Sequence, residues 1–209
     1  MKRGIIFGGG EITADNFVMD KIKPDDIVIC ADSGYAHAQR MNIKPFAVVG
    51  DFDSWNGDEP SDCVVEKASP HKDETDTALA VRLGQKYGCN EFLLFGMTGG
   101  RLDHTLANMQ LLRSLAQSGI KAALLDEREE IHMLCGETEL VVKNRKGYSF
   151  SIFSMDEQCS GVTVENAQYP LENAVLRGDF PLGVSNEFLN GDIRVSVKKG
   201  CLAVLLCKL

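Results

Sequence analysis

Short apolar runs alternate with helical patterns over roughly the first 130 residues of the chain. The runs span residues 4–7, 26–31, 46–49, 63–66, 91–95 and 121–125, and the helical patterns span residues 13–21, 33–42, 75–87 and 103–117. Runs that are apolar on consecutive residues suit strands that are buried on both faces. Strands and helices in alternation are typical of a mostly parallel sheet flanked by helices. We therefore expect an α/β domain over residues 1–130.

The pattern changes after about residue 126, where convincing helices stop and short strand-like runs follow. These runs span residues 131–134, 140–143, 149–153, 162–165, 174–176, 192–197 and 202–207. Turn signals separate them, and Asn190-Gly191 is typical of a two-residue hairpin. Many short strands at this spacing predict an all-β sandwich domain over residues 131–209.

Composition narrows the function classes. The chain has 209 residues and a formal net charge of -8, which argues against nucleic-acid binding because that function needs a basic face. No run approaches the length of a membrane span, and the apolar stretch near the N-terminus is too short for a signal peptide. We expect a cytoplasmic protein with no membrane partner.

The seven cysteines are scattered along the chain without a CxxC pair, and most lie inside apolar runs. This spacing favours neither a disulfide framework nor a zinc site. We expect buried thiols in a reducing compartment.

Two carboxylates follow the third apolar run, at Asp51 and Asp53. In an extended segment residues i and i+2 point the same way, so both carboxylates can reach one cation. Mg²⁺ prefers oxygen ligands and usually takes one or two carboxylates together with substrate phosphates. The motif therefore predicts a magnesium site at the carboxyl edge of the sheet, and the alternative is a polar turn that Asp53 caps.

A second polar loop opens the helical pattern at residues 75–87. It contains Lys72, Asp73, Thr75 and Asp76. A helix N-terminus and a lysine both favour phosphate oxygens. Simple capping by Asp73 or Thr75 is the alternative for those two residues, but capping does not account for Lys72.

A third loop, Gly99-Gly100-Arg101-Leu102-Asp103-His104, follows the run at residues 91–95. Arg101 can hold a phosphate with two donors. Asp103 is either a site contact or a helix cap, and His104 is more often a surface residue than a catalytic base. Gly8-Gly9-Gly10 and Ala31-Asp32-Ser33-Gly34 also follow strand-like runs, so they are expected at the same edge.

Together these segments resemble the thiamine pyrophosphokinase family. The resemblance is carried by five segments in order, namely Ala31-Asp32-Ser33-Gly34, Gly50-Asp51-Phe52-Asp53-Ser54, Lys72-Asp73-Glu74-Thr75-Asp76, Gly99-Gly100-Arg101-Leu102-Asp103-His104 and Ser185-Asn186-Glu187. Each segment alone is weak evidence for the family. Together, in this order and at this spacing, the segments extend over nearly the whole chain. Ser33 is a departure, because many relatives have glycine at this position.

The resemblance implies a homodimer that transfers a pyrophosphoryl group from ATP to the hydroxyl of thiamine with Mg²⁺. It implies that Asp51, Asp53 and Asp76 hold the metal, and that Asp73, Asp76 and Arg101 take part in catalysis. The expected nucleotide or substrate contacts are Asp32, Lys72, Thr75, Arg101, Asp103, Ser185 and Asn186. The base is left open between Asp73 and Asp76, although a metal-bound Asp76 is the poorer base.

Three other functions fit parts of the sequence. A pyrophosphokinase of the same fold could act on a pterin alcohol, and a dehalogenase-like phosphatase also uses Asp-x-Asp after an apolar strand. The phosphatase hypothesis leaves the loops at Lys72 and Arg101 unexplained. A nucleotide-binding regulator without turnover is the third, but a simple binder would not need so many carboxylates beside phosphates.

Overall fold

The computed structural model describes residues 2–50, 63–67 and 74–209. The predicted site residues Asp51, Asp53, Lys72 and Asp73 lie outside these ranges, as does Trp55. The chain divides into two compact units, which are Met1–Leu111 with Ile120–Glu127, and Leu112–Gly119 with Arg128–Leu209. None of the described helices is long and apolar enough to cross a membrane.

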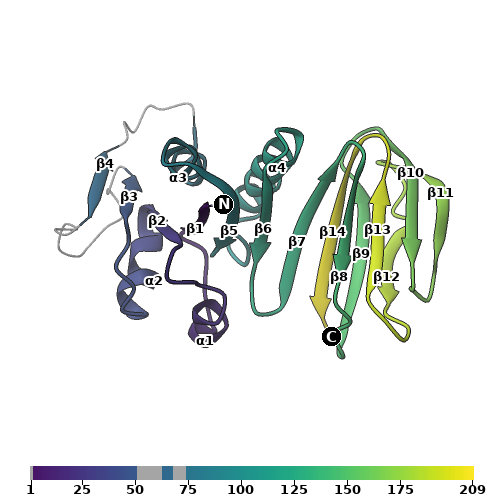
Figure 1. Ribbon diagram of the computed structural model, residues 1–209, viewed down its shortest axis with the longest axis horizontal. Helices are drawn as coiled ribbons and strands as arrows, with labels where there is room; N and C mark the ends of the chain where they lie inside the picture. Colours follow the sequence, from purple (N-terminus) through teal and green to yellow (C-terminus); the bar gives the residue numbers. More distant parts are fainter. Residues whose placement is uncertain (1, 51–62, 68–73) are drawn as a thin grey trace. The chain divides into compact units, whose positions relative to one another are not determined.

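The first unit contains a parallel sheet in the strand order β6-β5-β1-β2-β3-β4, as the pattern of apolar runs predicted (Figure 1). The strands are β1 (Lys2–Phe7), β2 (Ile27–Ala31), β3 (Ala47–Gly50), β4 (Val64–Lys67), β5 (Cys89–Phe95) and β6 (Lys121–Leu125). Strands β1, β2 and β3 are almost wholly buried, because helices cover both of their faces.

The helical segments of this unit are α1 (Asp15–Met19), the 3₁₀ turn η1 (Asp32–Gly34), α2 (Tyr35–Arg40), α3 (Asp76–Lys86) and the first part of α4 (Leu102–Gln117). Val18 of α1 and Ala38 of α2 share one buried cluster with Ile5, Phe7 and Cys30. On the opposite face, α3 lies so close to the sheet that a side chain at Gly84 would meet Phe92 and Ile29. The helices thus cover both faces of the sheet (Figure 1).

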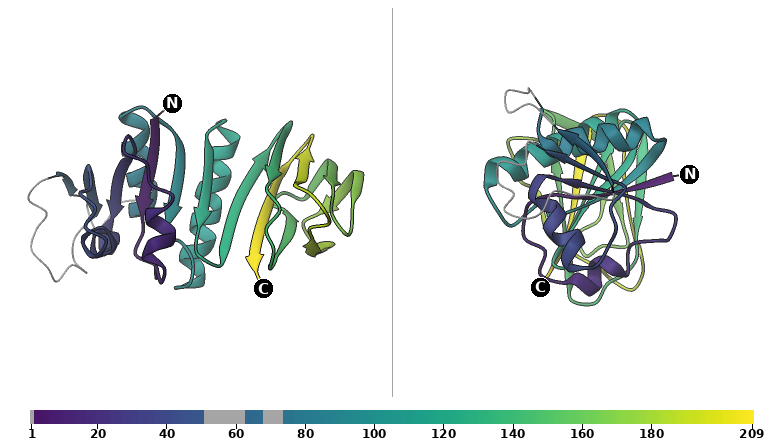
Figure 2. Two further views of the ribbon diagram at one scale, coloured as in Figure 1. Left: turned by 60° about the horizontal axis from the view of Figure 1, so that its bottom comes forward. Right: turned by 90° about the vertical axis from the view of Figure 1, so that its left-hand side faces the viewer.

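The second unit contains two antiparallel groups of strands (Figure 2). One has the order β12-β9-β14-β7 and consists of Gly183–Glu187, Tyr148–Ser154, Cys201–Lys208 and Glu129–Cys135. The other has the order β11-β10-β13-β8 and consists of Leu171–Arg177, Gln158–Glu165, Ile193–Val197 and Thr138–Val142. Fifteen buried residues from both groups, Phe150, Val162 and Leu202 among them, form one core, so the arrangement resembles a sandwich.

The predicted Asn190-Gly191 hairpin is wrong. β12 precedes this turn and pairs with β9, whereas β13 follows it and pairs with β10 and β8. The turn therefore joins two different sheets. Burial decides this outcome, because Phe188 packs on Phe150 of one sheet while Ile193 and Val195 enter the shared core from the other.

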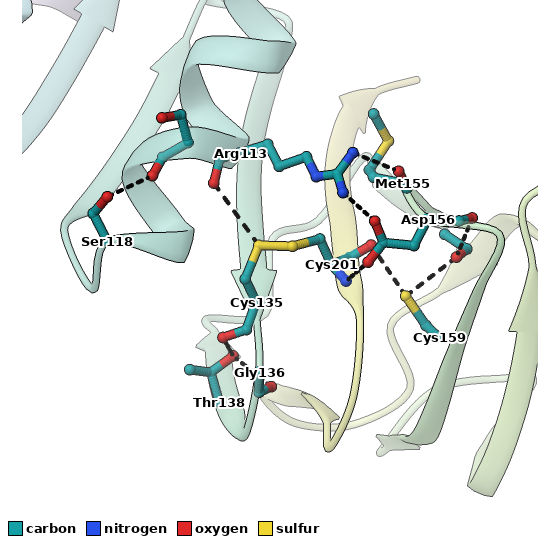
Figure 3. The surroundings of a disulfide bond; sticks show 11 residues. Arg113, Ser118, Cys135, Gly136, Thr138, Met155, Asp156, Cys159 and Cys201 are labelled. Carbon is teal, nitrogen blue, oxygen red and sulfur yellow. Dashed lines mark hydrogen bonds and ion pairs between the residues drawn. A yellow bond between two sulfur atoms is a disulfide. The ribbon is translucent and has the colours of Figure 1, made fainter.

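The expectation of unpaired thiols is wrong for two of the seven cysteines. Cys135 of β7 and Cys201 of β14 are direct partners in the antiparallel ladder, with Cα atoms 4.1 Å apart, and they form a disulfide bond (Figure 3). Sixty-six positions separate them in the sequence, so local spacing carried no signal. Cys30, Cys89 and Cys159 are buried free thiols, as expected.

Removing this disulfide should destabilise the second unit. A crosslink between distant positions restricts the unfolded chain, and its loss typically costs roughly 2–4 kcal/mol. We expect Cys135→Ser to lower the midpoint of thermal unfolding under oxidising conditions, and a reducing agent to lower the wild-type midpoint to a similar value.

The matched control is Cys207→Ser, because Cys207 lies on the same strand β14 but carries a free thiol. This variant should keep the response to reduction. A wild-type midpoint that does not move on reduction would contradict the predicted role of the crosslink.

Candidate active site

A cavity of about 490 Å³ opens at the carboxyl ends of β1, β2 and β5, the edge at which open α/β sheets bind ligands. Its walls come from the loops after these three strands and from the starts of α3 and α4. Of the predicted site residues that the structure describes, Asp32, Thr75, Asp76 and Arg101 all line it. The structure thus brings together residues that lie far apart in the sequence.

Glycines let the backbone segments at this edge pack against one another. A Cβ atom added at Gly10 would lie 2.6 Å from the carbonyl oxygen of Gly96, and one at Gly34 would lie 2.1 Å from that of Phe7. The amide of Gly10 donates a hydrogen bond to the Gly96 oxygen over 2.9 Å. Because no side chain fits between these segments, Gly9 and Gly10 present bare backbone to the cavity.

Asp32 follows β2 directly and lies in the left-handed region, with φ of 48°. Its backbone is the nearest neighbour of Gly50, the last residue of β3, where an added Cβ would lie 3.1 Å from the Asp32 Cα. β3 therefore ends beside Asp32, and Asp51 is the next residue in the sequence. The Ser33 hydroxyl lies against Gly9, because a Cβ there would be 2.3 Å from the Ser33 Oγ.

The start of α3 combines a cap with an acidic side chain. Thr75 is the N-cap, and its Oγ1 accepts a hydrogen bond from the amide of Ala78 over 3.2 Å. The capping interpretation of Thr75 is therefore confirmed. Asp76 occupies the first turn and lines the cavity, while Glu74 pairs with Arg82 over 2.8 Å.

At the start of α4, Arg101 and Asp103 form an exposed ion pair, with Nη2 and Oδ2 2.5 Å apart. The Asp103 carboxylate also accepts a hydrogen bond from the amide of His104. The Arg101 guanidinium therefore lowers the pKa of Asp103, and the carboxylate raises that of Arg101. Arg101 lines the cavity whereas Asp103 does not. Water screens this exposed pair, so Arg101 can exchange Asp103 for a phosphate at small cost.

Sequence reasoning missed Asn108, a buried residue of α4 that lines the cavity. Its Nδ2 donates a hydrogen bond to the carbonyl oxygen of Met97 over 2.9 Å, so it fixes the loop after β5. An asparagine four residues after His104, on the same helix face, was the available signal. His104 is exposed and lines the same cavity.

Ser185 and Asn186 belong to β12 in the second unit. Asn186 is buried, and its amide binds the backbone of Tyr169 twice, accepting from the nitrogen over 3.0 Å and donating to the oxygen over 2.8 Å. Ser185 is exposed with φ of 57°, and its amide donates to the Ser151 hydroxyl. The Asn186 amide thus binds the backbone of Tyr169, and the substrate contacts of both Ser185 and Asn186 stay predictions.

Carboxylates, an arginine and glycine-rich turns that meet at the carboxyl edge of a parallel sheet are typical of phosphate-transferring α/β enzymes. The comparisons with known proteins define the family. The model of the thiamin pyrophosphokinase catalytic domain matches residues 18–124, and the model of the family's vitamin B1 binding domain matches residues 137–202. The chain belongs to the thiamin pyrophosphokinase family, as its motifs predicted.

Individual relatives agree with this assignment. The chain is 32% identical over 185 residues to a thiamine pyrophosphokinase of Bacillus subtilis, with 85% of each chain covered. It is similar to the crystal structure of thiamine pyrophosphokinase from Bacillus subtilis, with a TM-score of 0.89, 26% identity and full coverage of both chains. It is also similar to the thiamin pyrophosphokinase from Geobacillus thermodenitrificans, with a TM-score of 0.87, 25% identity and coverage of 100% and 98% of the two chains.

The glycine packing at the cavity gives a direct test. Gly10→Ala should destabilise the protein by roughly 1–3 kcal/mol, because the added methyl group meets backbone oxygens that cannot move aside. Gly100→Ala is the matched control, since its Cβ would meet nothing within 4 Å. Unfolding by denaturant measures both variants. Equal stability of the two would contradict the close backbone packing.

Proposed function

We propose that the chain transfers the pyrophosphoryl group of ATP to the hydroxyl group of thiamine, which gives thiamine diphosphate and AMP. The observation that carries this proposal is the meeting of Asp32, Asp76 and Arg101 in one cavity of a chain that matches both domain models of the family. Group transfer between phosphates needs mainly positioning and neutralisation of charge. Such a cavity supplies a cationic donor and carboxylates for a metal.

The oxygen donors of the cavity fit Mg²⁺. Of the three carboxylates of described residues that line the cavity, Glu74 pairs with Arg82, and Asp32 and Asp76 are the two candidate ligands. That number suits an ion that takes one or two carboxylates and completes its shell with water and phosphate. Asp51 and Asp53, which follow β3 in the sequence, stay predicted ligands together with Asp76. When bound, Mg²⁺ neutralises phosphate charge and polarises the phosphoryl group.

Within this proposal Arg101 and Lys72 bind phosphate oxygens, and their charges stabilise the negative charge that develops during transfer. The thiamine hydroxyl attacks the β-phosphorus of ATP in line, the bond from the β-phosphorus to the α-phosphate oxygen breaks, and AMP leaves. Asp73 or Asp76 accepts the hydroxyl proton. Asp32 and Thr75 orient the nucleotide side of the site, and Asp103, which does not line the cavity, acts through its ion pair with Arg101.

The test is AMP release from ATP and Mg²⁺, measured with and without thiamine, with the organic product identified by its mass. Thiamine-dependent AMP and a product with two added phosphates are expected. AMP release with a pterin alcohol but not with thiamine would show that the acceptor is the pterin alcohol. ATP binding without release of AMP or ADP would contradict the enzyme activity and favour a nucleotide-binding regulator.

Asp76→Asn tests the carboxylate. It removes a negative charge from the cavity but leaves the Thr75 cap in place, so the fold should persist. We expect turnover to fall roughly 100-fold or more, as it does when one electrostatic contact of a transition state is lost. The control is Asp25→Asn, an exposed acid in the loop before β2, which should keep wild-type turnover. Normal turnover in Asp76→Asn would contradict the role of this residue.

We also propose that the active form is a homodimer. The described part of the second unit exposes several large apolar side chains close together in sequence, namely Phe180, Leu182 and Val184, with exposed fractions of 62%, 55% and 49%. Exposed apolar surface of this kind is typical of an interface between proteins.

Phe180→Glu should therefore weaken self-association, which sedimentation measures directly. Met19→Glu is the control, because Met19 is also an exposed apolar residue but lies on α1 of the first unit. A monomeric wild type, or an unchanged dimer in Phe180→Glu, would contradict this interface.

A further inference from the structure

A polar network that does not line the cavity holds one of its walls. His37 of α2 approaches the loop after β1, with its Nε2 2.8 Å from the carbonyl oxygen of Gly10. Its other ring nitrogen, Nδ1, lies 3.1 Å from Nη1 of Arg40, one helical turn further on. Arg40 in turn binds the carbonyl oxygen of Ile12 over 3.0 Å and pairs with Asp15 over 2.6 Å. The network thus ties α2 to residues 10–15.

The partners determine the state of the imidazole. A guanidinium only donates hydrogen bonds, so Nδ1 facing Arg40 must act as the acceptor. A carbonyl oxygen only accepts, so Nε2 must carry the hydrogen that it donates to Gly10. The neutral tautomer with hydrogen on Nε2 is the form that satisfies both contacts. A proton added at Nδ1 would face the guanidinium and break the contact with Arg40.

The hydrogen bond from His37 Nε2 holds the second polar group of the Gly10 backbone. Its amide nitrogen is bound to Gly96 on one side, and its carbonyl oxygen is bound to His37 on the other. Gly9 and Gly10 line the cavity, whereas His37 and Arg40 do not. A loop of glycines has many accessible conformations, so external contacts must hold it in one.

We propose that His37 and Arg40 are positioning residues, which hold the Gly8–Gly10 loop in the conformation that receives the phosphates of the nucleotide. The role builds on the proposed function, because it concerns the ATP side of the same cavity. Thiamine binding and the chemical step do not depend on it. Loss of the contact should therefore weaken ATP binding and leave turnover at saturating ATP largely unchanged.

The charges around His37 set the direction of a pH effect. Burial, and to a smaller extent the nearby Arg40 charge, lower the pKa of His37 below its ordinary value of 6.5, although the Gly10 contact and Asp15 act in the opposite direction. The folded state therefore binds fewer protons at this site than the unfolded chain does. The contact of His37 with Arg40, which supports this wall, is complete above pH 6.5 and is lost as the pH falls through the lowered value, because two cations then face each other.

The experiment compares two substitutions by the KM for ATP, kcat and direct binding of Mg-ATP by calorimetry. His37→Leu removes the donor, and we expect the KM for ATP and the Kd of Mg-ATP to rise roughly tenfold, the usual effect of one lost hydrogen bond, with kcat within about twofold. His37→Gln keeps an amide donor for the Gly10 oxygen and does not titrate. Its KM should be close to that of the wild type at pH 7.5.

The pH profile separates positioning from general destabilisation. The KM for ATP of the wild type, relative to that of His37→Gln, should rise as the pH falls through the lowered pKa of His37, and taking the ratio removes the titration of ATP itself. Arg40→Leu should move this rise to higher pH, because it removes a cation beside the ring. The matched control is His132→Gln, whose imidazole contacts Glu130 over 2.6 Å in the second unit and which should keep the wild-type pH profile.

The outcomes distinguish this role from the proposed function. Thiamine-dependent AMP release together with an unchanged KM and Kd in His37→Leu would overturn the positioning role and leave the function intact. Absence of AMP release together with weaker Mg-ATP binding in His37→Leu would overturn the proposed function and support the positioning role. A wild-type chain that binds no Mg-ATP would overturn both.

Discussion

Direct contact between backbone segments at the carboxyl edge of the parallel sheet is the constraint on which the rest of the first unit depends. Gly34 lies against the carbonyl oxygen of Phe7, and Gly10 lies against that of Gly96, at distances that leave no room for a Cβ atom. These contacts bring the ends of β1, β2 and β5 together. The starts of α3 and α4 line the same cavity at this edge.

Polar side chains also hold the loops at this edge of the sheet. Asn108 holds the loop after β5 through the Met97 oxygen, and His37 holds the loop after β1 through the Gly10 oxygen. Both residues act on backbone carbonyls, and neither carries the charge that draws attention in a sequence at neutral pH. The loops that line the cavity are therefore held by side chains that bind their backbone carbonyls.

The second unit is stabilised differently. Its core is a continuous set of apolar residues between two antiparallel groups of strands, and the Cys135–Cys201 bond fixes two neighbouring strands of one group. Asn186 shows how polar motifs serve such a unit, because its amide is committed to the backbone of Tyr169. These two hydrogen bonds hold β12, the strand on which the exposed Ser185 lies, against the segment of Tyr169.

The sequence by itself determined the alternation of strands and helices, the change to an all-β pattern near residue 126, and the family, because burial periodicity and ordered motifs are local properties. It also identified Asp32, Asp76 and Arg101 as residues of one site, since parallel strands bring their carboxyl ends to one edge. Only the tertiary structure decided that Asn190-Gly191 joins two sheets, that Cys135 pairs with Cys201, and that His37 and Asn108 support the cavity. These outcomes depend on which distant segments become neighbours, and packing of the whole core decides that after the local pattern is satisfied.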